Sequence, residues 1–167
     1  AERPFTQFLF TDGVTHARER GMVSKWFTPR RIAAWEPRVR EVARELLAPL
    51  MDREECDIIQ DFAALFPMAL ISELLGIPAA DRDMVRRWSD DYLARDPGNP
   101  EPPERAVKAD AALADYFRAA RDDRRRRPRE DLLTFLANTE LEHEDGTHPL
   151  TDGHYVGNCQ LLVIAGN

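Results

Sequence analysis

The last stretch of the chain, residues 150–167, constrains the fold more than any other. Thr151 or Asp152 can cap the free amides of a first helical turn. From Leu161 to Ile164 the sequence is apolar on every side, and a helix of this kind is buried on all sides by other elements. Glycine within a helix costs about 1 kcal/mol relative to alanine. Ala165-Gly166 therefore predicts a bulky group lying flat against the backbone.

The overall composition is that of a soluble globular protein with one domain. Hydrophobic residues make up 43% of the chain and charged residues 32%, which are ordinary proportions. The formal net charge of −7 argues against nucleic acid as the partner of the whole protein. No segment reads as a signal peptide or membrane anchor. Because the sequence stops inside an apolar helix and begins without Met, we expect an internal piece of a longer protein.

Periodicity predicts a mainly α fold of about seven helices with at most a small β element. Prolines at 97, 100, 102 and 103 predict an exposed loop over residues 96–103. Cys56–Ile59 is short and β-prone, and predicts the one strand. Cys159, in contrast, lies within the final helix and is expected to act as a small hydrophobe. The predicted helices span residues 15–27, 35–50, 61–75, 81–92, 104–126, 131–136 and 151–167.

Three polar groups are candidates for chemistry. His16 and Arg20 are four residues apart on a predicted helix, so they either form a two-pronged grip for a carboxylate or phosphate or are two unrelated surface residues. The run Arg124–Arg127 precedes Pro128 and predicts a solvated helix end. His143 and His148 lie among acidic residues, where a solvated loop is favoured over a metal site.

Four stretches stand in order along the chain, among them Asp12–Arg20 with Trp26–Arg30 near the start and Leu150-Thr151 with Leu161–Asn167 at the end. In this order and at this spacing they resemble the bacterial cytochromes P450. The first resembles the family's Asp-Pro-Pro-x-His-x-x-x-Arg segment with its trailing Phe-Thr-Pro-Arg, although Gly13-Val14 replaces the two prolines. The last resembles the apolar helix that ends in Ala-Gly. The stretches are Asp12–Arg20 with Trp26–Arg30; Asp57–Ala63 with Phe66-Pro67, Ile71, Leu74–Pro78 and Asp81; Pro128–Leu133; and Leu150-Thr151 with Leu161–Asn167.

The resemblance implies a partial cytochrome P450 fold and a haem cofactor. Residues 1–167 would be one incomplete domain, the N-terminal and middle part of the fold, ending inside its central oxygen-binding helix. His16 and Arg20 would bind the haem propionates. Ala165 and Gly166 would cover the distal face, where small residues leave room for dioxygen in catalysis. Leu162 would also lie against the cofactor, and Leu161 and Ile164 against the substrate.

The resemblance also implies the activity of a haem-thiolate monooxygenase, which inserts one oxygen atom from dioxygen into an apolar small molecule. The ending Ala-Gly-Asn is similar to the corresponding residues in branches of the family that oxidise terpenoids and steroids. The axial cysteine would lie in the missing C-terminal part, so the 167 residues alone are expected to be inactive. The setting would be cytoplasmic and the electron donor ferredoxin-like, with Arg18 and Lys25 either helping to dock it or simply solvated.

Two alternatives to an active enzyme remain. A non-redox helical ligand-binding or regulatory module would also explain amphipathic helices around an apolar pocket. A family relative that has lost catalysis and only binds its ligand is the other. Haem uptake distinguishes the first alternative from an enzyme, and substrate turnover distinguishes the second.

Overall fold

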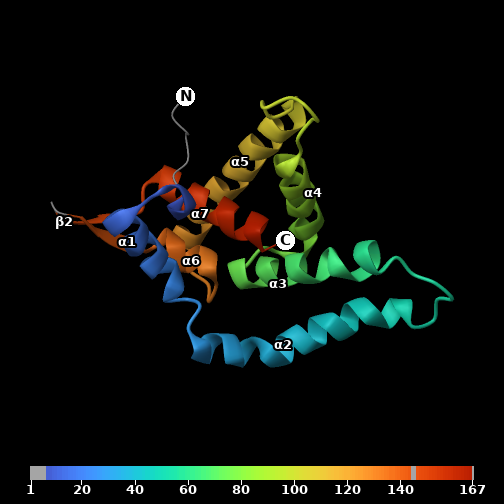
Figure 1. Cartoon of the computed structure of the whole chain (residues 1–167). Helices are drawn as coiled ribbons and strands as arrows, with labels where there is room; N and C mark the ends of the chain where they lie inside the picture. The colour runs from blue at the N-terminus through green and yellow to red at the C-terminus, as the bar shows by residue number, and fades with distance from the viewer. Residues whose placement is uncertain (1–6, 144–145, 167) are drawn as a thin grey trace.

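The computed structural model describes residues 7–143 and 146–166, and this part of the chain is mainly helical (Figure 1). Short 3₁₀ turns occur at Phe8–Phe10, Ala48–Leu50 and Ala79–Asp81. The helices are α1 (Gly13–Ser24), α2 (Pro29–Leu47), α3 (Leu65–Leu75), α4 (Arg82–Leu93), α5 (Glu104–Arg126), α6 (Leu132–Ala137) and α7 (Asp152–Ala165). One antiparallel hairpin joins β1 (Glu140–His143) to β2 (Gly146–Pro149). The predicted mainly α class is confirmed.

Helix α7 passes through the middle of the molecule and packs on α3, α5 and α6 (Figure 1). Helices α4 and α5 form a V that is closed at its tip by the proline-rich loop. Helices α2 and α3 lie side by side along one edge, and α1 with the hairpin forms another edge. The core lies where α5, α6 and α7 meet, and its fully buried side chains include Leu113, Phe117, Leu132, Leu136, Tyr155 and Val156.

Local signals explain most of the helix ends. Thr28 caps α2 by accepting a hydrogen bond from the Arg31 amide, and Pro29 occupies the first helical position. Asp131 caps α6 and Thr151 caps α7 in the same way. Gly76 ends α3 with a φ of 88°, in the left-handed region that favours glycine. Within the described residues, no helix is both long enough and apolar enough to cross a membrane.

The strand prediction was wrong in place. Cys56–Ile59 forms no strand; the chain instead enters a π-helical turn at Ile59–Ala63, and α3 starts after it at Leu65. The hairpin lies in the segment predicted to be a solvated loop, with Leu141 opposite His148. Strand β2 is exposed, and both strands consist mainly of polar residues. They therefore lack the apolar alternation by which a strand is recognised.

The prediction for the arginine run was also wrong at Arg124. This side chain is only 4% exposed, and its Nε donates to Asp131 Oδ2 at 2.7 Å. Its Nη2 donates to the Gly76 carbonyl oxygen, also at 2.7 Å. The side chain therefore joins the ends of α3 and α5 to the start of α6, while Arg125, Arg126 and Arg127 are exposed as expected.

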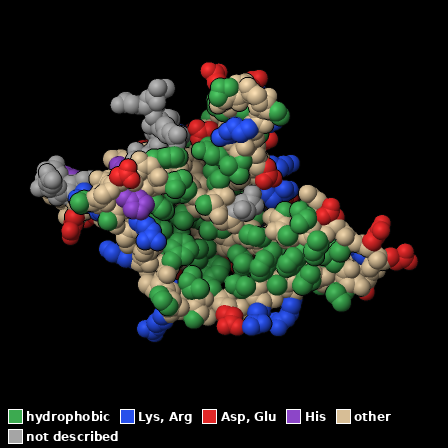
Figure 2. Space-filling model, in the orientation of Figure 1, with side chains coloured by type: hydrophobic (Ala, Val, Ile, Leu, Met, Phe, Trp, Pro, Cys, Tyr) green, Lys and Arg blue, Asp and Glu red, His purple; other side chains and the backbone are tan. Residues whose placement is uncertain are grey.

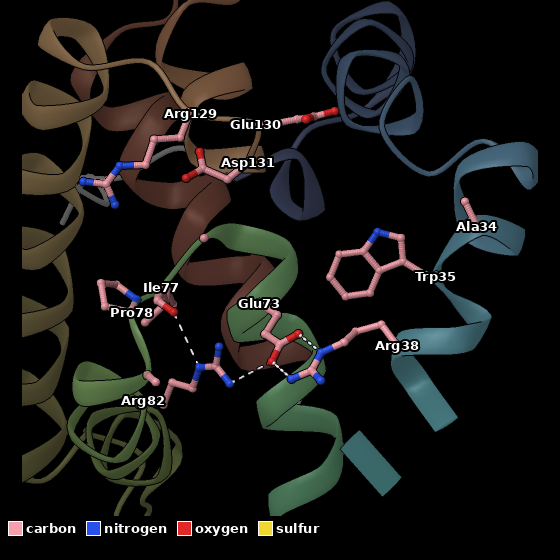
Figure 3. Close-up of a pocket in the computed structure, with 12 residues that line it drawn as sticks. Ala34, Trp35, Arg38, Glu73, Ile77, Pro78, Arg82, Arg129, Glu130 and Asp131 are labelled. Atoms are coloured by element: carbon pink, nitrogen blue, oxygen red, sulfur yellow. Dashed lines mark hydrogen bonds and ion pairs between the residues drawn. The ribbon is translucent and has the colours of Figure 1, made fainter. Parts of the chain in front are cut away.

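A second group of ions joins α2 to α3 at an open pocket of about 570 Å³ (Figure 3). Arg38 donates through Nε and Nη2 to the two Glu73 carboxylate oxygens, at 2.8 and 2.6 Å. Arg82 donates to the same carboxylate at 3.1 Å. Hydrogen bonds from Arg38 hold the pKa of the Glu73 carboxyl below its usual value, against the opposing effect of burial; Arg82 lowers it further.

We expect Glu73→Gln to remove part of the protein's loss of stability in acid. Because the folded pKa of Glu73 is lowered, its contribution is present above the ordinary carboxyl pKa of 4.5 and is lost as pH falls through the lowered value. The contribution should be about 1 kcal/mol. The free energy of unfolding, measured from pH 7 downwards, should therefore fall less steeply in Glu73→Gln. Glu41→Gln is the control, since that exposed carboxylate also contacts Arg38; equal effects would contradict the assignment.

Candidate functional site

Helix α1 carries the predicted anion grip, formed by His16 and Arg20. The His16 ring is half-buried with its Nδ1 at 2.8 Å from the Phe8 carbonyl oxygen. A carbonyl oxygen only accepts hydrogen bonds, so Nδ1 carries a proton and the ring orientation is fixed. Arg20 is exposed, and its guanidinium contacts no partner among the described residues. One turn of helix separates the two side chains, which leaves the imidazole Nε2 and the guanidinium for the same ligand.

The proton on Nδ1 decides which ligand this pair can bind. When His16 is neutral, its Nε2 is an acceptor and cannot donate to a carboxylate. When the ring is protonated on both nitrogens, Nε2 donates, and the pair then offers two cationic donors. The guanidinium fork of Arg20 suits the two oxygens of a carboxylate or phosphate. The chemistry of this pair fits a carboxylate such as a haem propionate.

The other predicted site residues lie at the end of α7, which is less enclosed than expected. The fully buried residues of the helix are Tyr155–Gln160 and Val163, and the helix packs on α3, α5 and α6. Leu161, Leu162 and Ile164 are half-buried and Ala165 is exposed. The prediction of a helix buried on all sides was therefore wrong for most of its apolar end, because the described elements cover the middle of α7 more completely than its last turn.

Gly166 does have a bulky neighbour, but that neighbour is a side chain of α3. Gly166 follows α7 as its C-terminal cap instead of lying within the helix. A methyl group added to it would lie 2.8 Å from Ile71 Cγ1 and 3.0 Å from the Leu162 carbonyl oxygen. The absent side chain thus allows α3 and the end of α7 to approach closely. Asn167 lies outside the described residues.

Helix α1, which carries His16 and Arg20, and the end of α7 border a surface rich in hydrophobic side chains (Figure 1 and Figure 2). Figure 2 shows these side chains between α1 and the α2–α3 pair, with Lys, Arg and His side chains over α1 at the border. An apolar groove of about 490 Å³ between α2 and α3 reaches Gly166. The groove is lined mainly by Ile32, Trp35, Val39, Pro67, Leu70, Ile71 and Leu74. Together, the predicted grip on α1 and this apolar surface would suit an amphiphilic ligand.

The two cysteines lie in different surroundings. Burial raises the pKa of the Cys159 thiol, which keeps it protonated inside the core. Cys56 is exposed in the loop before the π-helical turn. The described residues contain no cluster of three or more His, Cys, Asp or Glu suited to a metal ion. Residues 144–145 and the His143 side chain, part of the acidic segment predicted to be a solvated loop, lie outside the described residues.

Sequence reasoning missed two polar residues that join the helices of the site. Glu19 on α1 is only 2% exposed, and its Oε1 lies 3.0 Å from Nε2 of His154 on α7. Glu19 follows His16 by three residues and precedes Arg20, so its spacing resembles that of an ordinary surface charge. His154 occupies the third position after the cap Thr151, where a polar residue is usual. Neither position signals a buried contact between distant segments.

The comparisons with known proteins confirm the resemblance to cytochromes P450. Cytochrome P450 109 of Bacillus spizizenii is 36% identical over 167 residues, which covers 95% of this chain and 40% of the relative. The structure of myxobacterial cytochrome P450 CYP267B1 in complex with myristic acid matches with a TM-score of 0.84 and 36% identity, covering 98% of this chain and 40% of that one. CYP109E1 from Bacillus megaterium in complex with testosterone matches with a TM-score of 0.83 and 33% identity, covering 96% of this chain and 42% of that one.

These matches extend over nearly all of this chain but over a minor part of each relative. The chain spans about 40% of the length of the curated relatives that it matches. No family model matches it.

Proposed function

We propose that this chain forms part of a haem-thiolate monooxygenase, because its sequence and fold are similar to those of part of a cytochrome P450. The activity would be insertion of one oxygen atom from dioxygen into an apolar small molecule. The observation that carries the proposal is the 36% identity and TM-score of 0.84 to a cytochrome P450 over 98% of the chain. Residues 1–167 would be an incomplete domain from the N-terminal and middle part of that fold, inactive without the rest.

Haem fits the groups on the face described above. His16 and Arg20 would bind its propionates, and the half-buried Leu162 would lie against its apolar ring. Bound haem supplies the redox chemistry, in which a cysteine thiolate on the iron favours cleavage of the O–O bond. That thiolate would come from outside this chain, because Cys159 is protonated and buried in the core and Cys56 lies in a distant exposed loop.

The end of α7 would shape the space above the haem. Ala165 is exposed and carries only a methyl group, which leaves room for dioxygen. Gly166 would contribute through its small size as well, although its α3 side is already filled by Ile71. Leu161 and Ile164 would contact the substrate and keep water from it. The chain's own part in catalysis is thus to orient, to exclude water and to leave space.

The substrate would be an apolar small molecule. Relatives of known structure hold myristic acid and testosterone, and a terpenoid- or steroid-like compound would suit the apolar end of α7. A ferredoxin-type protein would supply electrons and could dock on the cations Arg18 and Lys25 of the α1 segment. The two unpaired cysteines fit a reducing, cytoplasmic setting.

The propionate assignment predicts that the whole protein loses haem faster when both His16 and Arg20 are replaced by Ala. Hydrogen bonds to charged groups contribute about 1.5–3 kcal/mol each, so loss of the pair should speed haem release by at least about tenfold. Release is measured as transfer of haem to excess apomyoglobin. The control Arg30→Ala/Arg44→Ala also removes two exposed cations, but from α2. If His16→Ala/Arg20→Ala released haem no faster than this control, the two residues would not hold propionates.

A further inference from the structure

A buried carboxylate lies within the turn of α1 that carries the anion grip. Glu19 is three residues after His16 and directly before Arg20, yet its side chain is turned inward and is only 3% exposed. Its Oε1 lies 3.0 Å from His154 Nε2. Its Oε2 lies 3.4 Å from the hydroxyl of Thr11, which donates at the shorter distance of 3.0 Å to the Phe8 carbonyl oxygen. His154 is therefore the main partner of this carboxylate.

His154 is itself held from its other side. Its Nδ1 lies 2.7 Å from the Thr151 hydroxyl, which also accepts from the His154 amide at 3.2 Å. The carboxylate of Glu19 accepts, so Nε2 carries a proton, while the hydroxyl can either donate to Nδ1 or accept from it. The contact therefore persists whether the imidazole is neutral or charged. It joins α1 to the first turn of the helix that ends in Ala165 and Gly166.

The position of Glu19 on α1 gives it a second possible partner. Residues three apart on a helix are neighbours, so the carboxylate can also reach His16. A buried carboxylate that loses its partner is strongly unfavourable and has to find another donor. Without His154, a donor at that spacing on the same helix is the His16 ring, once it is protonated on both nitrogens and its Nε2 can donate. A pair between Glu19 and His16 would occupy the grip and cancel one of its two positive charges.

We propose that Glu19 and His154 are positioning residues for the anion grip. His154 holds the Glu19 carboxylate on the α7 side of α1, so that His16 and Arg20 remain available to an external anion. The contact also fixes α1 against α7, and so fixes the grip relative to the end of α7. The identity of the anion as a haem propionate rests on the proposed function, whereas the grip itself rests on the geometry of α1.

Three variants of the whole protein separate this role from simple stabilisation. His154→Leu leaves Glu19 without its partner. Glu19→Leu/His154→Leu removes both polar side chains and fills the space with apolar ones. Glu19→His/His154→Glu reverses the pair. It places Glu at the third position after the Thr151 cap, where Glu is common at the start of a helix. Thermal unfolding of each variant reports whether the fold is retained.

The first measurement is haem transfer to apomyoglobin. His154→Leu should release haem at least tenfold faster than the parent. The apolar variant Glu19→Leu/His154→Leu and the reversed variant Glu19→His/His154→Glu should release it at a rate within about threefold of the parent's. An equal rate for His154→Leu and the parent would overturn the proposal. So would a rate as fast in the apolar variant as in His154→Leu, because Glu19 could then not be the competitor.

The second measurement needs no haem and so stands apart from the proposed function. In haem-free protein with isotope-labelled histidine, inorganic phosphate should shift the NMR signals of the His16 ring. This shift is expected in the parent and in Glu19→Leu/His154→Leu. In His154→Leu the same signals should start at a different position and shift less with phosphate, because Glu19 would then be paired with the His16 ring. Identical His16 signals and phosphate responses in parent and His154→Leu would contradict the proposal. Failure of the parent to bind haem would instead count against the monooxygenase assignment alone.

Discussion

Replacing Arg124 by Ala should lower the free energy of unfolding by about 3–5 kcal/mol, the usual cost of breaking a buried ion pair. Asp131 is only 7% exposed and would be left without the guanidinium that neutralises it. The Gly76 carbonyl oxygen would lose its 2.7 Å donor as well. Since these groups join α3, α5 and α6, the loss should appear in global unfolding, measured by urea denaturation followed by circular dichroism.

Arg126→Ala is the matched control for this prediction. It belongs to the same run of arginines and the same last turn of α5, but its side chain is exposed. Exposed substitutions of this kind usually change stability by less than about 0.5 kcal/mol. If Arg124→Ala destabilised the protein no more than Arg126→Ala, the buried pair would not hold the three helices together.

Gly76→Ala should destabilise the protein by at least about 3 kcal/mol, from two separate causes. The φ of 88° costs an L-residue about 1–2 kcal/mol. The added methyl carbon would also lie 2.2 Å from Asp131 Oδ2 and 2.5 Å from Asp131 Cβ. No such approach is tolerated, so Asp131 must move away from Arg124, which breaks the buried pair.

Gly98→Ala isolates the first of these causes. Gly98 has a similar φ of 80°, but an added methyl group there meets nothing within 4 Å. It should therefore show only the backbone strain. The difference between the two variants, measured as free energies of unfolding under the same conditions, is the cost of displacing Asp131. Equal losses in Gly76→Ala and Gly98→Ala would contradict the close packing at Gly76.

The sequence predicts those parts of the fold in which a local rule operates alone. Helix α5 spans 104–126, as expected, because its apolar face is regular and prolines stand just outside both ends. The end of α3 at Gly76 and the cap of α7 at Thr151 follow from residue types with one dominant role. The hairpin was missed although Asp145-Gly146 is a turn signal, because polar strands around it lack an apolar alternation.

Contacts between distant segments account for what could not be predicted. Arg124 is one of four consecutive arginines, and its burial depends on a carbonyl group 48 residues earlier in the chain. The inward direction of Glu19 depends in the same way on His154. At the candidate site, spacing alone left open whether His16 and Arg20 act together. The hydrogen bond of His16 to Phe8 and the exposed guanidinium of Arg20 favour the grip.

The most direct test of the central claim is a reduced carbon monoxide difference spectrum of the whole protein that contains this sequence, with the 167-residue chain recorded alongside. A haem-thiolate monooxygenase predicts a thiolate-type Soret band in the whole protein and none in the chain alone, because the proposal places the ligand cysteine outside this chain. Absence of any haem signal in the whole protein would contradict the assignment and leave a helical binding module as the better explanation.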